Sequence, residues 1–303
     1  MNSTATETQL ESEIVPAASA TCTICAANTT LRGMRRGYKI YRCKSCQHLF
    51  VWPIPANIRP LYSTDYSGVA EGFRFVDSDR DKEPKVFTFE RYLDLLNKYS
   101  PGNGSILDVG AATGFFLNLA RQRGWETYGV EPSDYAAGLG RKKGIKIKTG
   151  VLEKSDFRPN SFDAVTLWDR IEHLPEPGAT LQTIKRTLKR GGVLAINTPD
   201  SGSVLAATMR LNWYQVAPPE HINLFHRNSL RTLLESYGFE VLTVESIGKR
   251  FTMQYAFQKL AHWSGSGVSQ QIALRLASLS IGKLGVSINL FDNMVVCARK
   301  VSW

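Results

Sequence analysis

The stretch Ile106–Leu117, ILDVGAATGFFL, joins an apolar run to a turn of small residues between two glycines. A dinucleotide-binding turn reads G-x-G-x-x-G, in which the middle glycine lets the backbone approach a pyrophosphate. Here the turn runs from Gly110 to Gly114 with alanine in its middle and without lysine. It satisfies neither that fingerprint nor the G-x-x-x-x-G-K-[ST] phosphate loop, so it predicts a ligand with no phosphate at the turn.

Two acidic residues mark the strand ends beside this turn. Asp108 precedes it, where a carboxylate repels a pyrophosphate but can hold a cation or hydroxyl groups. Glu131 lies seventeen residues past Gly114, in TYGVEPS, where an α/β sheet carries the carboxylate that binds ribose hydroxyls. A positively charged nucleoside without phosphate fits both acids, and the pattern therefore indicates S-adenosylmethionine as the cofactor.

The composition predicts one main domain with smaller attachments, since the chain has 303 residues of which 43% are hydrophobic. No apolar run approaches the roughly 18 residues that a membrane helix requires, and the N-terminus lacks the pattern of a secretory signal. We therefore expect a cytoplasmic protein. Residues 1–20 predict a disordered leader, because they bury too little surface to offset chain entropy.

The formal charge of +10 is compatible with a nucleic acid, an anionic membrane surface or an anionic substrate. The basic residues are scattered over the segments 31–36, 140–148 and 185–190. Scattered bases are more often a solvated face than a binding footprint, so the charge alone selects no partner.

Four of the five cysteines form the pattern C-x2-C-x17-C-x2-C. They are Cys22, Cys25, Cys43 and Cys46. Two such pairs bring four thiolates around one tetrahedral Zn²⁺ and leave no open coordination position, which predicts a structural zinc site. His48 is a packing or surface histidine by this interpretation, and Cys297, in the apolar run NMVVCA, is a small core residue.

The chain divides at its prolines and by its strand and helix patterns. We expect a zinc module at 21–56, a linker at 57–83 and a main domain at 84–303 with an insertion at about 201–228. Alternating strands and helices in the main domain predict a Rossmann-like α/β fold, a parallel sheet with helices on both faces. The expected strands are 105–110, 125–132, 145–150, 161–169, 193–200 and 288–300, and the expected helices are 84–100, 115–124, 134–144, 177–192 and 229–238.

The motifs LDVGAATG, GVEPS, FDAVTLWDRIEHL, LKRGGVLAINTP and LRTLLESYGFEVLTVES follow one another in order. In this order they resemble the class I S-adenosylmethionine-dependent methyltransferase family over residues 85–248. The resemblance implies that the glycine turn, with Asp108, Gly110 and Gly114, passes under the methionine part of the cofactor. It also implies that Glu131 binds the ribose.

The same resemblance assigns the rest of the cofactor site. It places Asp156 and Phe157 against adenine, and Trp168 and Asp169 near the sulfonium. The sequence departs from the family at Ala112, where glycine is frequent.

A narrower likeness rests on the four cysteines, a tyrosine-rich linker and the later stretch PPEHINLF. Together they are similar to bacterial methyltransferases of glycan and antibiotic-sugar pathways, including deoxysugar C-methyltransferases. This likeness implies that His173, Glu220 and His221 act on the sugar. The cysteine spacing is shorter than in that group, and Pro218 replaces an expected tyrosine, for which Tyr214 is the nearest candidate.

The resulting prediction is an enzyme that methylates a small-molecule or glycan acceptor and removes its proton with His173 or the Glu220–His221 pair. The structural alternatives are that His173 is a packing residue and that Glu220 and His221 belong to a lid held by polar contacts. The alternative functions are a zinc-ribbon rRNA or tRNA methyltransferase and a non-catalytic binding module of the same fold. Segment 252–290, basic and amphipathic, fits packing on the domain, a homodimer surface or a peripheral membrane contact.

Overall fold

The computed structural model of the protein describes residues 20–55, 82–100, 104–252 and 285–301, with the single residues Val268, Gln271 and Arg275. Residues 1–19 of the expected leader, nearly all of the expected linker and most of segment 252–290 lie outside these residues.

The main domain is built on a seven-stranded sheet in the order β10-β13-β8-β7-β4-β5-β6. Its strands are β4 (Ser105–Val109), β5 (Glu126–Glu131), β6 (Lys146–Thr149), β7 (Phe162–Trp168), β8 (Leu188–Pro199), β10 (Phe239–Glu245) and β13 (Asn293–Lys300). The five strands from β8 to β6 are parallel neighbours, whereas β13 lies antiparallel between β8 and β10. The expectation of a parallel sheet is wrong at this edge, because β13 runs antiparallel to both of its neighbours and the apolar pattern of a strand does not fix its direction.

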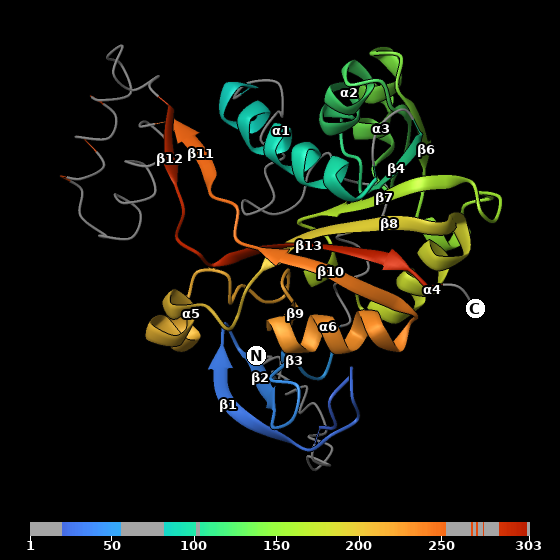
Figure 1. Ribbon diagram of the computed structural model, residues 1–303. Helices are drawn as coiled ribbons and strands as arrows, with labels where there is room; N and C mark the ends of the chain where they lie inside the picture. Colours follow the sequence, from blue (N-terminus) through green and yellow to red (C-terminus); the bar gives the residue numbers. More distant parts are fainter. Residues whose placement is uncertain are drawn as a thin grey trace, which may run out of the picture.

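Helices cover both faces of this sheet, as the α/β pattern predicts (Figure 1). The first face carries α1 (Lys82–Tyr99), α2 (Phe115–Gln122) and α3 (Asp134–Lys142), and the second carries α4 (Pro177–Thr187) and α6 (Arg227–Ser236). Each layer buries its own apolar cluster against the sheet. The Rossmann-like architecture expected from the sequence is confirmed.

The boundary between α4 and β8 falls earlier than the glycines suggest. The helix ends at Thr187, and Leu188 is already extended and pairs with Phe162 of β7. The glycines lie inside the strand, at the shift of register between β7 and β8, where Gly191 adopts a φ of 74°. A glycine pair marks a β-bulge here and not a helix end.

The cysteine-rich module forms a second sheet that includes a strand from the insertion. Its order is β1 (Thr29–Arg35), β2 (Tyr38–Cys43), β3 (Leu49–Val51) and β9 (Asn223–Leu224). The insertion also contributes α5 (Val204–Met209) and the 3₁₀ turn η5 (Arg210–Asn212). Trp213 is fully buried between the insertion and the hairpin, in one apolar cluster with Ile40 and Val51.

The remaining elements are two short turns and a hairpin. They are η3 (Leu152–Lys154), η4 (Ile171–His173) and the pair β11 (Lys249–Thr252) and β12 (Gly285–Ile288). Within the described ranges, no helix has both the length and the apolar character needed to cross a membrane.

Candidate functional site

The glycine turn connects β4 to α2 and has an unusual backbone. Gly110, Ala112 and Gly114 have φ angles of 85°, 48° and 72°, in the left-handed region that favours glycine. A Cβ at Gly110 would lie 3.2 Å from the side chain of Arg170, so the turn passes close under the segment that follows β7. Ala112 adopts the strained conformation with a side chain, at the position where the sequence departs from the family.

Glu131 ends the neighbouring strand β5 and is buried. Its Oε2 accepts a hydrogen bond from the backbone N–H of Ala112 at 3.0 Å, and its Oε1 accepts from Ser133 at 2.9 Å. These bonds fix the carboxylate against the glycine turn. A carboxylate has about four lone-pair positions, so two remain for ligand hydroxyls, which fits the expected ribose role.

Asp108 is buried at the end of β4 and accepts a hydrogen bond from Thr166 Oγ1 at 2.7 Å. The pKa of Asp108 is raised to about 7, chiefly by burial; the hydrogen bond from Thr166 lowers it, and the charge of Glu131 adds a smaller increase. Two carboxyl groups therefore share the carboxyl edge of the sheet, where a cationic ligand would favour their ionised forms.

Trp168 and Asp169 end β7 on the side of the sheet that faces α1. The Trp168 ring stacks on Tyr92 with centroids 4.8 Å apart and meets the edge of Phe116 at 5.2 Å. Its buried Nε1 has no hydrogen-bond partner among the described residues. Asp169 is exposed, has a φ of 49° and accepts a hydrogen bond from Asn197. An indole N–H without a partner beside the glycine turn is consistent with a ligand-binding wall.

Asp156 and Phe157 lie at the other end of the predicted site and differ from each other. Asp156 is exposed and pairs with Lys148, whose hydrogen bond lowers the pKa of the carboxyl group. Phe157 is buried against Phe162, and the Lys148 ammonium lies 4.6 Å from its ring. Their expected role at adenine stays a prediction.

Two of the predicted catalytic residues meet directly. The ring of His173 lies edge-on to that of His221, with centroids 4.7 Å apart. The Nδ1 of His173 lies 2.9 Å from the carbonyl oxygen of Glu220, and the Nδ1 of His221 lies 2.8 Å from that of Gln215. Because a carbonyl oxygen only accepts, each Nδ1 carries a proton.

The histidine pair adjoins the glycine turn through Arg170. This residue lies over Gly110 and immediately precedes η4, which ends at His173. Burial lowers the pKa of His173 well below its usual value, and the charges of His221 and Arg170 act in the same direction, against the bond to Glu220. His173 is therefore neutral at pH 7 and able to accept a proton.

The sequence analysis missed Glu172, which the structure places beside this pair. Its buried Oε1 lies 4.0 Å from His173 Nε2, and its Oε2 accepts a hydrogen bond from Thr198 at 2.9 Å. Ligand atoms of Glu172, His173 and His221 lie within 4.8 Å of one another, so the set could also hold a divalent cation. Glu172 directly precedes His173 in the sequence IEHL, and this adjacency could have indicated that the two side chains lie close together.

Glu220 and Tyr214 contact other side chains, and their expected role at a sugar stays a prediction. The carboxylate of Glu220 pairs with Arg36 at 3.4 Å, in the turn between β1 and β2, and only its carbonyl contacts His173. The Tyr214 hydroxyl donates to Asp292, which also accepts from Trp213 Nε1 at 3.3 Å.

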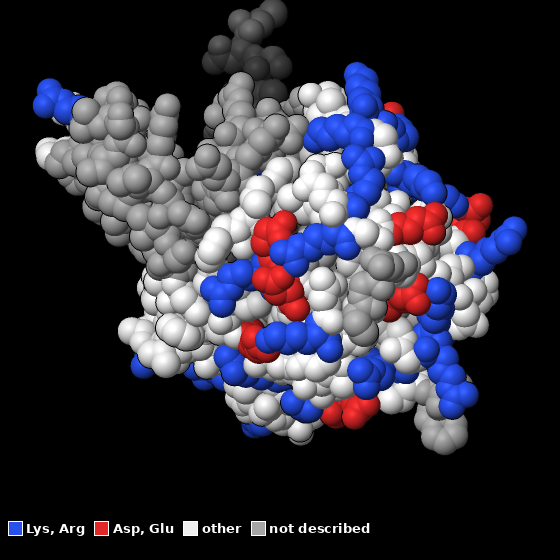
Figure 2. All heavy atoms as spheres, turned by 45° about the horizontal axis from the view of Figure 1, so that its top comes forward, with Lys and Arg blue, Asp and Glu red and all other residues white. Residues whose placement is uncertain are grey.

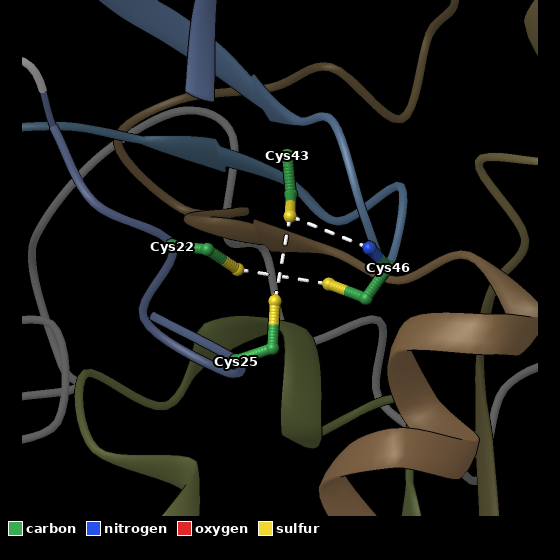
Figure 3. Close-up of side chains that lie close together, drawn as sticks. All are labelled: Cys22, Cys25, Cys43 and Cys46. Carbon is green, nitrogen blue, oxygen red and sulfur yellow. Dashed lines mark hydrogen bonds between the residues drawn. The ribbon is translucent and has the colours of Figure 1, made fainter. Parts of the chain in front are cut away.

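The four cysteines of the N-terminal module converge on one point (Figure 3). The Sγ atoms of Cys22 and Cys46 lie 3.6 Å apart, those of Cys25 and Cys43 lie 3.5 Å apart, and no disulfide joins them. Backbone N–H groups donate to Cys22 and Cys43. In a tetrahedral site with Zn–S bonds of about 2.3 Å, neighbouring sulfurs lie about 3.8 Å apart, so the cluster fits such an ion. His48 is buried against Phe50 as a packing residue.

The basic charge is not gathered on the face that Figure 2 shows. Lysine and arginine side chains there are interleaved with acidic ones. Among the described residues, several lysines also pair with acids, among them Lys146 with Glu126 and Lys189 with Asp163. This face lacks the continuous basic stripe typical of a nucleic-acid footprint.

The family model and the relatives that match this chain are all methyltransferases. Residues 85–244 match a family model described as a methyltransferase domain. The chain is 22% identical to the ubiquinone biosynthesis O-methyltransferase of Idiomarina loihiensis over 206 residues, 63% of this chain and 84% of that protein. It is 27% identical to the C-methyltransferase NovU of Streptomyces niveus over 146 residues, 46% of this chain and 34% of NovU.

Solved structures show the same fold at low identity. A putative methyltransferase from Bacillus halodurans has a TM-score of 0.51 and 18% identity, over 69% of this chain and 99% of that chain. A complex of the Haloferax volcanii Trm112 methyltransferase activator with a putative methyltransferase gives a TM-score of 0.52 and 16% identity, over 75% of this chain and 96% of that chain.

Proposed function

Because this chain belongs to the methyltransferase family whose domain its residues 85–244 match, we propose that it methylates a hydroxyl or an activated carbon of a small, sugar-like acceptor. Its class as an S-adenosylmethionine-dependent methyltransferase agrees with its relatives and its fold. The acceptor, the proton-accepting residue and the zinc are the parts that we propose.

The observation that carries the proposal is the buried, neutral ring of His173, which lies edge-on to His221 and follows the segment that passes over the glycine turn. Its Nδ1 is held by the backbone carbonyl of Glu220, so its Nε2 is the atom that accepts a proton. A methyl acceptor bearing a hydroxyl or an acidic C–H needs such a group. A purely binding protein has no need for a neutral imidazole fixed in this way.

The cofactor supplies a methyl group on a sulfonium, whose departure requires no protonation. The protein binds it through the glycine turn and the free lone pairs of Glu131, and aligns the acceptor with its methyl carbon. His173 Nε2 takes the acceptor proton, and the buried carboxylate of Glu172, 4.0 Å away, stabilises the imidazolium that forms. Proton removal of this kind contributes about 10²–10⁴-fold to a rate.

The four cysteines hold a structural zinc ion in this proposal. Four sulfur ligands leave no position for substrate, so the ion stabilises the module and takes no part in methyl transfer. Elemental analysis of purified protein should find one zinc per chain, and Cys46→Ser should lose it. Retention of zinc by this variant would refute the assignment.

Cofactor binding is tested by calorimetry with S-adenosylhomocysteine on Glu131→Ala and on Glu126→Ala as the matched control. Both glutamates lie on β5, but Glu126 is exposed at the start of the strand. We expect Glu131→Ala to abolish detectable binding and Glu126→Ala to bind like the wild type. Equal binding by both variants would overturn the ribose assignment.

Proton removal is tested by radiolabelled methyl transfer to a panel of hydroxylated aromatics, free sugars, nucleotide-linked sugars and RNA. We expect transfer to a small hydroxylated acceptor, with His173→Gln lowering turnover at least 100-fold at unchanged cofactor affinity. Labelling of RNA alone would favour the RNA-methyltransferase alternative. Cofactor binding without transfer to any acceptor would favour the non-catalytic one.

A further inference from the structure

A cavity of about 500 Å³ lies between the cysteine-rich sheet and the insertion, and its charged lining is basic. Three arginines reach it from three chain segments: Arg32 from β1, Arg42 from β2 and Arg210 from the junction of α5 and η5. Ser201, Asn212 and His226 also contribute polar side chains to its wall. No aspartate or glutamate lines it among the described residues.

The charge of these arginines is not compensated within the described part of the chain. Their side chains form no ion pair or hydrogen bond there, unlike Arg36, which pairs with Glu220, and Arg227, which pairs with Asp200 at 2.7 Å. Arg36 and Arg227 thus have acidic partners, whereas the three cavity arginines line one cavity without an acidic partner among the described residues.

Two polar atoms of the cavity wall are buried without a hydrogen-bond partner in the described residues, Arg42 Nε and Ser201 Oγ. A buried polar group without a hydrogen-bond partner costs about 1–3 kcal/mol of stability. A native structure retains such a group where a bound ligand supplies the missing partner. Burial lowers the pKa of Arg42, and the charge of Arg32 lowers it further. An anion bound in the cavity would raise this pKa again, because its negative charge stabilises the protonated guanidinium.

We propose that this cavity binds a phosphate or pyrophosphate group. The guanidinium fork matches phosphate oxygens in a bidentate way, and three such groups balance a ligand of two or three negative charges. A volume of about 500 Å³ is in the range of small-molecule sites and exceeds what a single inorganic ion requires. The group therefore belongs either to a free ion or to a phosphorylated organic molecule.

This site would give the cysteine-rich module a function. Arg42 directly precedes Cys43, so the fold of the cysteine cluster sets the position of one cavity wall. The inference is independent of methyl transfer, and it rests on the proposed function only where the organic phosphate is identified as the methyl acceptor.

The test is calorimetry on the full-length, zinc-replete protein with inorganic phosphate, pyrophosphate and uridine diphosphate. The probe variant is Arg32→Gln with Arg210→Gln, both at exposed positions. The control is Arg190→Gln with Arg231→Gln, which removes the same charge from exposed positions outside the cavity. We expect saturable binding at one site per chain, weakened at least tenfold in the probe variant and less than threefold in the control.

Each outcome decides the proposal. Tighter binding of uridine diphosphate than of pyrophosphate would assign the site to an organic phosphate, and equal binding would assign it to the free ion. Absence of saturable binding, equal weakening in the control, or binding of single-stranded RNA but of no small phosphate would overturn the inference. Binding of S-adenosylhomocysteine, measured on the same samples, separates this failure from failure of the proposed methyl transfer.

Discussion

Replacing Asp108 with asparagine should make the protein less sensitive to rising pH. The carboxyl group of Asp108 is buried at the end of β4, and burial raises its pKa from 3.8 to about 7. The folded protein therefore keeps this proton between about pH 4 and pH 7, while the unfolded chain releases it. Asparagine has nearly the same shape, stays neutral and can still accept the hydrogen bond from Thr166.

The sign and size of the effect follow from linkage. Since the folded state binds more protons in this window, the free energy of unfolding falls as the pH rises. The interval between the two pKa values corresponds to about 4 kcal/mol in total, of which about 2 kcal/mol is lost between pH 5.5 and pH 8. For a domain of this size, that loss is about 4–8 °C in Tm.

The assay is thermal unfolding of the wild type and Asp108→Asn at pH 5.5 and pH 8. The difference in Tm between the two proteins should shift by about 4–8 °C in favour of the variant at the higher pH. Asp163→Asn is the control: burial raises the pKa of Asp163, but Lys189 and Ser105 outweigh it and leave the pKa lowered. The stability that Asp163 contributes is lost only as the pH falls through this lowered value, so its replacement should leave the slope between pH 5.5 and pH 8 unchanged.

A parallel pH dependence of the wild type and Asp108→Asn would refute this reasoning. It would mean that Asp108 is already ionised in the folded protein at pH 5.5.

Three further substitutions, two of them with a control variant, test other parts of the structure. Trp213→Ala should lower the free energy of unfolding by about 3–5 kcal/mol in urea titration, because it empties the cluster that joins insertion and hairpin, whereas Tyr135→Ala, 71% exposed, should stay within about 0.5 kcal/mol. Glu172→Gln should slow methyl transfer about 10- to 100-fold without changing the affinity for S-adenosylhomocysteine, and an unchanged rate would remove its proposed role. Gly129→Ala should destabilise the protein by about 1–3 kcal/mol, since its Cβ would come within 2.7 Å of a neighbouring alanine side chain. Gly138→Ala, with space around it in α3, should be neutral or stabilising.

The strands and helices of the central domain could be predicted because their local patterns are strong. Strand β7 is nearly continuous in buried residues, as a parallel strand covered on both faces must be. The position of β13 could not be predicted in this way, because a run of apolar residues predicts a strand but not its neighbours or its direction. Strand β9, two residues long, is too short to produce any periodicity.

In the candidate site, too, only the contacts between residues close in sequence could be predicted. The glycine turn and Glu131 are close in sequence and belong to one βαβ unit, so their meeting follows from local geometry. The contact of Glu220 with Arg36, by contrast, joins residues 184 positions apart. The arginine cavity is similar: segment 31–36 predicts a solvated face when considered alone, and only the fold brings Arg32 to Arg42 and Arg210.

The small second sheet connects the cysteine cluster to the histidine pair. Cys43 ends β2, β2 pairs with β3, and β3 pairs with β9, which begins two residues after His221. Asn223 of β9 contacts His48 at 3.1 Å and donates to the carbonyl of Leu174, next to His173. A disturbance at the cysteines thus reaches both imidazoles through paired strands, whereas the glycine turn and Glu131 belong to the other sheet. This connection agrees with the proposal that the histidine pair meets the acceptor, because it would give the cysteine module a role in positioning that pair.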